Sequence, residues 1–153
     1  MNDDLLGVNI LVADDDLDDC FLTEKAFRDA GLKNSLHFVH DGEQLLSYLR
    51  REAPYDDSDK YPFPGLILLD LNMPLKDGRE ALLEIKSDAE LRSTPVVILT
   101  TSSSADDIEQ SYAEGVNSFI TKPTSFSGLQ EMVKSIGKYW LETVKLPAIG
   151  KES

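Results

Sequence analysis

Cysteine, histidine and basic residues are scarce in this chain of 153 residues. The single cysteine, Cys20, excludes an internal disulfide and a cysteine-based zinc cluster, and it suits a reducing cytoplasm. Lysine and arginine total 15 against 28 acidic residues, so the net charge is −13. Such a charge repels nucleic acid and anionic lipid surfaces. We therefore expect no nucleic-acid partner. His37 and His40 have no metal-ligand spacing.

Long hydrophobic runs are also missing. The longest unbroken aliphatic stretches, Leu66–Leu69 and Val96–Leu99, cover four residues each, whereas a membrane-spanning helix needs about 20. The first four residues, MNDD, are acidic where a secretory signal is basic. We therefore expect a cytoplasmic protein that neither enters a membrane nor is exported.

The composition that remains is that of one globular domain, with 41% hydrophobic and 28% charged residues. A chain of this length buries about 68–70% of its unfolded surface, which allows a substantial core. We expect a single domain over residues 1–153, with a core over about 7–140, a C-terminal extension over about 141–153, and no effector domain.

Short apolar segments alternate with segments of helical spacing. The first kind predicts strands at Val8–Ala13, Leu36–Val39, Leu66–Leu69, Val96–Leu99 and Asn117–Ile120. The second kind predicts helices around Phe21, Leu22, Ala26 and Phe27; Leu45, Leu46 and Leu49; Ala81, Leu82 and Ile85; Ile108, Tyr112 and Ala113; and Leu129, Met132, Val133, Ile136 and Trp140. This alternation predicts an α/β fold, a doubly wound parallel sheet with helices on both faces.

Glycine and proline mark the expected ends of these elements. Gly31 and Gly115 follow helical segments, where a positive φ is commonly required. The long connection from Arg50 to Gly65 contains three prolines and three aspartates. We interpret it as a surface loop, with a contact to a partner as the alternative.

Polar residues follow four of the predicted strands. The four strand ends read Ala13-Asp14-Asp15-Asp16, Leu69-Asp70-Leu71-Asn72, Thr100-Thr101-Ser102 and Thr121-Lys122-Pro123. In doubly wound sheets, ligands bind at this edge. Two carboxylates about 4 Å apart repel by about 4 kcal/mol at an effective dielectric near 20, so gathered acids need protons or a cation. Oxygen ligands favour Mg²⁺, Mn²⁺ or Ca²⁺, and a phosphoryl group would suit Mg²⁺, with Lys122 and Thr100 binding its oxygens.

Each of these residues also has a simpler interpretation. The three consecutive aspartates can cap a helix and supply its acidic first turn, and Asp16 in particular is expected to be the cap. Asp70 and the threonines can cap turns, and Lys122 can be an ordinary surface lysine. Coincidence at four successive strand ends is much rarer than any one of these, which favours a single site.

Four motifs occur in a fixed order along nearly the whole chain: ILVADD at 10–15; LILLDLNMP at 66–74 with Asp77-Gly78; VILTT at 97–101; and FITKP at 119–123. In these the chain resembles the receiver domains of two-component response regulators. The resemblance implies a flavodoxin-like, five-stranded sheet of order 2-1-3-4-5. Ser111-Tyr112, Val116-Asn117, Tyr139-Trp140-Leu141 and Leu146-Pro147 are similar to the stand-alone regulators that serve phytochromes and related kinases.

The resemblance implies the metal site and the reacting group. Asp70 would accept the phosphoryl group, and Asp14 and Asp15 would be the acidic pair that holds Mg²⁺, or Mn²⁺ in its place. Asp70 itself and the backbone carbonyl of Asn72 would complete the protein ligands. The pair could also be read as Asp15 and Asp16, although counting from the strand favours Asp14 and Asp15.

The resemblance also implies the groups that surround the phosphoryl oxygens. Thr100 would be the switch hydroxyl, Thr101 a phosphate contact through its backbone, and Phe119 the aromatic switch residue. Lys122 would neutralise the transferred oxygens, and the Lys122–Pro123 bond would be cis.

These roles together imply a signalling module that is no enzyme beyond its own phosphorylation and dephosphorylation. A sensor histidine kinase, phytochrome-like among others, or a phosphotransfer protein would donate the phosphoryl group. Phosphorylation would then alter a protein-binding surface at the fourth helix and fifth strand. The apolar residues of the segment 139–153 would either pack on the chain's own core or form a homodimer contact.

Three other classes of protein fit parts of the pattern. Asp14, Asp16 and Asp18 have the spacing of an EF-hand, but Asp19 stands where that loop needs glycine and Lys25 where it needs glutamate. A flavodoxin-like FMN carrier would use residues 100–104 as a phosphate loop, which contain no glycine. An aspartate-dependent phosphatase would have a second aspartate at the position of Asn72.

Overall fold

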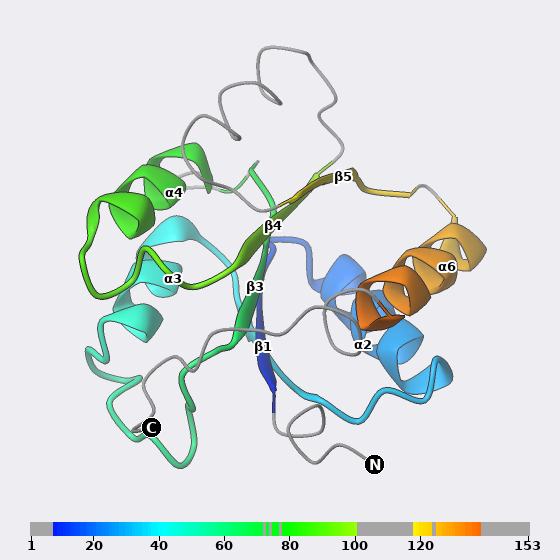
Figure 1. The fold of residues 1–153 in the computed structure, drawn as a ribbon, viewed down its shortest axis with the longest axis horizontal. Helices are drawn as coiled ribbons and strands as arrows, with labels where there is room; N and C mark the ends of the chain where they lie inside the picture. Colours follow the sequence, from blue (N-terminus) through cyan, green and yellow to red (C-terminus); the bar gives the residue numbers. More distant parts are fainter. Residues whose placement is uncertain are drawn as a thin grey trace.

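A parallel sheet of five strands forms the centre of the molecule (Figure 1). The strands are β1 (Asn9–Ala13), β2 (Ser35–Val39), β3 (Leu66–Leu69), β4 (Val96–Thr100) and β5 (Ser118–Thr121). Their order is β2-β1-β3-β4-β5, and each neighbouring pair runs parallel. This confirms the predicted fold class and strand order, and each strand limit lies within one residue of its predicted position.

The computed structural model describes residues 8–71, 73, 75–76, 78–100, 118–123 and 125–138, with only the backbone at Thr100 and Ser118. The helix predicted around Ile108 and the C-terminal extension therefore lie outside the described residues. So does Trp140, predicted as the last apolar residue of the final helix. No helix of the described part is long and apolar enough to cross a membrane.

Helices cover both faces of the sheet (Figure 1). On one face lie α2 (Leu17–Asp29) and α6 (Phe126–Ile136), and on the other lie α3 (Gly42–Leu49) and α4 (Gly78–Ser87). Successive residues of a strand point to opposite faces, so β1 sends Ile10 and Val12 to the α2–α6 side and Leu11 to the α3–α4 side. β3 has all four residues buried because both of its faces are covered.

Side-chain caps begin three of the helices. Asp16 caps α2 by accepting from the backbone N–H groups of Asp18 and Asp19 at 2.9 and 3.2 Å. Asp41 caps α3, and Ser125 caps α6. After α2, Gly31 has a φ of 78°, the positive value predicted for it. All four residues that predicted this helix lie within α2, although Phe21 is 66% exposed.

Three tyrosines hold the connection between α3 and β3 against the domain. Tyr48 of α3 lies 5.3 Å from Tyr55 and 5.8 Å from Tyr61 between ring centroids, and those two rings are 5.0 Å apart. The Tyr48 hydroxyl donates to the carbonyl of Pro62 at 2.8 Å. The connection is therefore packed on α3 through an aromatic cluster, and a partner contact there stays a prediction.

Candidate functional site

Three carboxylates gather at the carboxyl ends of β1 and β3. These strands are neighbours in the sheet, and the backbone N–H of Asp70 donates to the carbonyl of Ala13 at 2.9 Å. Asp14 and Asp70 are buried while Asp15 is exposed, and one oxygen from each lies within 4.8 Å of the others. The edge of the sheet thus brings together acids that are more than fifty positions apart in the chain, as the sequence predicted.

Asp14 forms hydrogen bonds through its backbone N–H, its carbonyl and its carboxylate. Its backbone N–H donates to the carbonyl of Val39 at 3.0 Å, and its Oδ1 accepts from the backbone N–H of Asp16 at 3.0 Å. Its carbonyl accepts from Nδ1 of His40 at 3.0 Å, which fixes the proton of that ring on Nδ1. Burial raises the pKa of the Asp14 carboxyl, and the hydrogen bond from Lys122 only partly opposes this rise.

Lys122 brings one positive charge into the acidic cluster from the segment after β5. Its Nζ lies 2.7 Å from Oδ2 of Asp14, 3.1 Å from Oδ2 of Asp70 and 3.1 Å from Oδ2 of Asp19. Burial alone would lower the pKa of Lys122, but the hydrogen bonds and charges of these acids raise it above its usual value. The lysine therefore stays an ammonium and compensates part of the acidic charge.

A glycine at the start of α4 lets this helix approach the acidic edge. A Cβ on Gly78 would lie 2.5 Å from the carbonyl oxygen of Asp70 and 2.6 Å from Cα of Leu71. The backbone N–H of Gly78 donates to the carbonyl of Leu71 at 2.9 Å. A side chain here would push α4 off the segment that carries Asp70.

The other predicted site residues differ in how far the structure describes them. Thr100 ends β4 and pairs with Thr121, but its side chain lies outside the description, as do Thr101 and Asn72 altogether. Phe119 lies in β5, partly buried against the core on the α3–α4 side.

One expectation for Lys122 was wrong. In the described part of the chain the cis peptide bond is Ala53–Pro54, and the Lys122–Pro123 bond is not cis. The ammonium nevertheless reaches the carboxylates of Asp14 and Asp70, at 2.7 and 3.1 Å.

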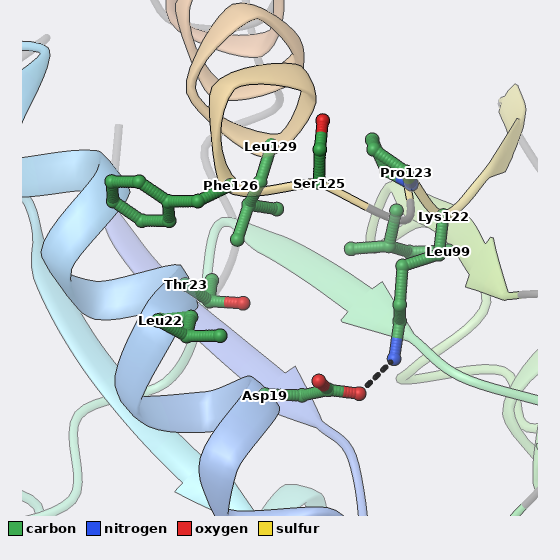
Figure 2. A pocket seen from close by; sticks show the side chains of 9 residues that line it. All are labelled: Asp19, Leu22, Thr23, Leu99, Lys122, Pro123, Ser125, Phe126 and Leu129. Atoms are coloured by element: carbon green, nitrogen blue, oxygen red, sulfur yellow. Dashed lines mark hydrogen bonds and ion pairs between the residues drawn. The ribbon is translucent and has the colours of Figure 1, made fainter.

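Two residues near the site were missed by the sequence reasoning. Asp19 was weighed only as a failed EF-hand position, yet it binds Lys122, as Figure 2 shows. His40 has no metal-ligand spacing in the sequence, yet its ring binds the Asp14 backbone. Helical spacing could have pointed to Asp19, which lies three residues after the cap at Asp16 and so faces the same end of the sheet.

The site and the fold together define a class of protein. The model for the response regulator receiver domain matches residues 10–134, and the chain belongs to this family of signalling modules. Response regulator Rcp1 of Synechocystis is 42% identical over 139 residues, which cover 91% of this chain and 92% of that protein.

Two solved structures of similar proteins show the same architecture. The phosphorylated cyanobacterial phytochrome response regulator RcpA is 42% identical, with a TM-score of 0.86 over 93% of this chain and 99% of that one. The Mn²⁺-bound form of Rcp1 is 40% identical, with a TM-score of 0.83 over 92% of this chain and 99% of that one.

The donor set of the acidic cluster fits a hard divalent cation. The donors of Asp14, Asp15 and Asp70 are all carboxylate oxygens, the ligands that Mg²⁺ and Mn²⁺ prefer. The exposure of Asp15 leaves one side of the cluster open to water, which Mg²⁺ retains in most protein sites. The cluster could therefore hold such an ion.

Proposed function

We propose that this protein accepts a phosphoryl group on the carboxylate of Asp70 and passes the signal on through a change in its surface. The observation that carries the proposal is the convergence on Asp70 of the largely covered ammonium of Lys122, which follows β5, and of two further carboxylates, which follow β1. The family, in which regulators of phytochrome systems accept phosphoryl groups from kinases, supports the same role.

The metal of the reaction would be Mg²⁺, with Mn²⁺ as the alternative. Asp14, Asp15 and Asp70 would hold it, together with the backbone carbonyl of Asn72. When bound, the ion supplies positive charge to the transferred oxygens and offsets the repulsion between the carboxylates. The solved Mn²⁺-bound form of response regulator Rcp1 supports this choice of ion.

In the transfer step, a carboxylate oxygen of Asp70 attacks the phosphorus of a phosphohistidine. A new P–O bond forms while the P–N bond breaks, and the electron pair of that bond stays on the leaving imidazole, which takes up a proton. Lys122 holds its positive charge beside the attacked group and neutralises the phosphoryl oxygens. Water later hydrolyses the acyl phosphate and restores the carboxylate.

The donor would be a sensor histidine kinase or a phosphotransfer protein, with a phytochrome-like kinase favoured by the similarity to Rcp1 and RcpA. The single cysteine, Cys20, suits a reducing compartment and supports a cytoplasmic location. Thr100 and Thr101 would bind the new phosphoryl group, and Phe119 would respond to the movement of Thr100. Output would go to another protein, and the segment 139–153 would either pack on the chain's own core or form a homodimer contact.

The experiment is incubation with acetyl phosphate and Mg²⁺, followed by the intact mass of the protein. We expect one added phosphoryl group on the parent chain, and none after EDTA or in Asp70→Asn. Asp59→Asn is the matched control, because Asp59 lies exposed in the connection between α3 and β3. A folded parent that binds Mg²⁺ and gains no mass, or an Asp70→Asn variant that gains the same mass, would refute the proposal.

A further inference from the structure

Lys122 has a third carboxylate partner, which lies outside the cluster of Asp14, Asp15 and Asp70. Asp19 approaches Nζ at 3.1 Å from the first turn of α2, and Figure 2 shows the two side chains meeting at the edge of a pocket between α2 and α6. The side chain of Asp19 is 38% exposed, against 6% for Asp14 and 11% for Asp70. Asp19 therefore meets the ammonium from the solvent side, and the two buried acids meet it from within.

The three carboxylates saturate the ammonium. A lysine has three N–H donors, and Nζ of Lys122 has an oxygen of Asp14, of Asp70 and of Asp19 within 3.1 Å. Each of the three partners therefore supplies one of the contacts that hold Nζ in place, and the loss of one partner removes one of these contacts.

Asp19 differs from the other two partners in what happens to it during the reaction. Among the described residues, the carboxylates that could share a metal ion are Asp14, Asp15 and Asp70, and Asp19 is outside this group. A cation in the cluster would therefore compete with Lys122 for Asp14 and Asp70 but leave Asp19 to the lysine. Phosphorylation would likewise change Asp70 and leave Asp19 as it was.

The backbone of Asp19 is held in position by contacts that do not involve Lys122. Its backbone N–H donates to the carboxylate of Asp16, the cap of α2, at 3.2 Å. The next residue, Cys20, is buried, with its Sγ 3.5 Å from the carbonyl of Asp14. The start of α2 is thus anchored to the strand end that carries Asp14, which keeps the backbone of Asp19 beside Lys122.

We propose that Asp19 is a positioning residue for Lys122, because it is the carboxylate that still holds the ammonium beside Asp70 when a cation has occupied Asp14 and Asp70. This inference rests on the proposed function. It assigns Asp19 no contact with the phosphoryl group, and its effect on the reaction passes through Lys122.

The test is a double-mutant cycle on phosphorylation by acetyl phosphate at saturating Mg²⁺. Asp19→Asn keeps the size of the side chain and removes its charge, and we expect it to slow the reaction about 3- to 10-fold. Asp19→Glu should recover most of the rate. In a Lys122→Met background, Asp19→Asn should change the residual rate by less than about twofold, because the lysine through which it acts is gone.

The matched control is Asp18→Asn. Asp18 is an exposed acid in the same first turn of α2, so the substitution removes the same charge from the same helix end. We expect Asp18→Asn to alter the rate by less than about twofold. Equal slowing by Asp18→Asn and Asp19→Asn, or an undiminished effect of Asp19→Asn without Lys122, would overturn the inference.

Titration calorimetry of Mg²⁺ binding to the same variants provides a second double-mutant cycle that does not depend on the phosphorylation rate. When Asp19 is replaced by a neutral residue, Lys122 should pair more strongly with Asp14 and Asp70 and compete with the ion for them. Asp19→Asn should therefore weaken Mg²⁺ binding about threefold more than Asp18→Asn does. In the Lys122→Met background the two variants should bind Mg²⁺ alike. A parent that is phosphorylated but shows no such coupling refutes only the role of Asp19, whereas a parent that neither binds Mg²⁺ nor gains a phosphoryl group refutes the proposed function as well.

Discussion

Removal of the Lys122 ammonium should destabilise the metal-free protein far more than the protein with Mg²⁺. The side chains of Lys122, Asp14 and Asp70 are 12%, 6% and 11% exposed, so Lys122→Met leaves two buried carboxylates without their cation. Loss of one partner from a buried ion pair costs about 3–5 kcal/mol. We therefore expect the free energy of unfolding in EDTA to fall by about 3 kcal/mol.

Mg²⁺ should reverse most of this loss. At the 4.8 Å limit within which the three carboxylate oxygens lie, two unit charges repel by about 3.5 kcal/mol at an effective dielectric near 20. A divalent ion compensates that repulsion with or without Lys122, and without the competing ammonium it should bind more tightly. The difference between the parent and Lys122→Met should therefore shrink below about 1.5 kcal/mol at saturating Mg²⁺.

Urea unfolding with EDTA and with Mg²⁺ measures both quantities. Lys134→Met is the control, since Lys134 is 61% exposed and meets Glu131 at 3.7 Å; a pair of this kind contributes about 0–1 kcal/mol. A loss in EDTA no larger than that of the control would refute the reasoning. So would a loss that Mg²⁺ leaves unchanged, because the lysine would then not be the counter-ion of the cluster.

Three further predictions concern the surroundings of the site. Gly78→Ala places a Cβ 2.5 Å from the Asp70 carbonyl oxygen and should lower the free energy of unfolding in urea by about 1–3 kcal/mol; an unchanged midpoint would contradict this. Burial raises the pKa of Tyr48 to about 12, so the unfolded state, with an ordinary pKa of about 10, ionises first and stability falls as the pH rises from 10 to 12 by up to about 2.7 kcal/mol. Tyr48→Phe should lessen this alkaline loss, as measured by urea unfolding at pH 8 and pH 11, and an equal loss in both proteins would count against it. Burial also raises the pKa of the Cys20 thiol to about 12, so a thiol reagent at pH 8 should label the folded protein at least about a hundredfold more slowly than the urea-unfolded chain, and equal rates would disprove the assignment.

The sheet and the acidic cluster could be predicted because both follow from regular features of the sequence. Short apolar runs such as Leu66–Leu69 favour strands that are buried on both faces. A parallel sheet then brings the carboxyl ends of its strands together at one edge. The assignment of Asp16 to capping and of Asp14 to the cluster also followed from counting along β1. Position in a strand was enough to place these residues.

Contacts made by helix faces and loops could not be predicted in the same way. Asp19 is one of several aspartates near the start of α2, and although helical spacing points toward it, its contact with Lys122 depends on how α2 lies over the sheet. The packing of Tyr55 and Tyr61 on Tyr48 depends on the path of an irregular connection. Phe21 has helical spacing but lies on the side of α2 that no described element covers.

The order in which the charged residues are synthesised has a consequence for folding. Lys122 follows Asp70 by 52 positions and Asp14 by 108, so the acids emerge long before their amine. Until the residues after β5 are made, the growing chain lacks the amine that meets Asp14 and Asp70 in the described part of the folded protein, and these acids should attract that amine as β5 docks.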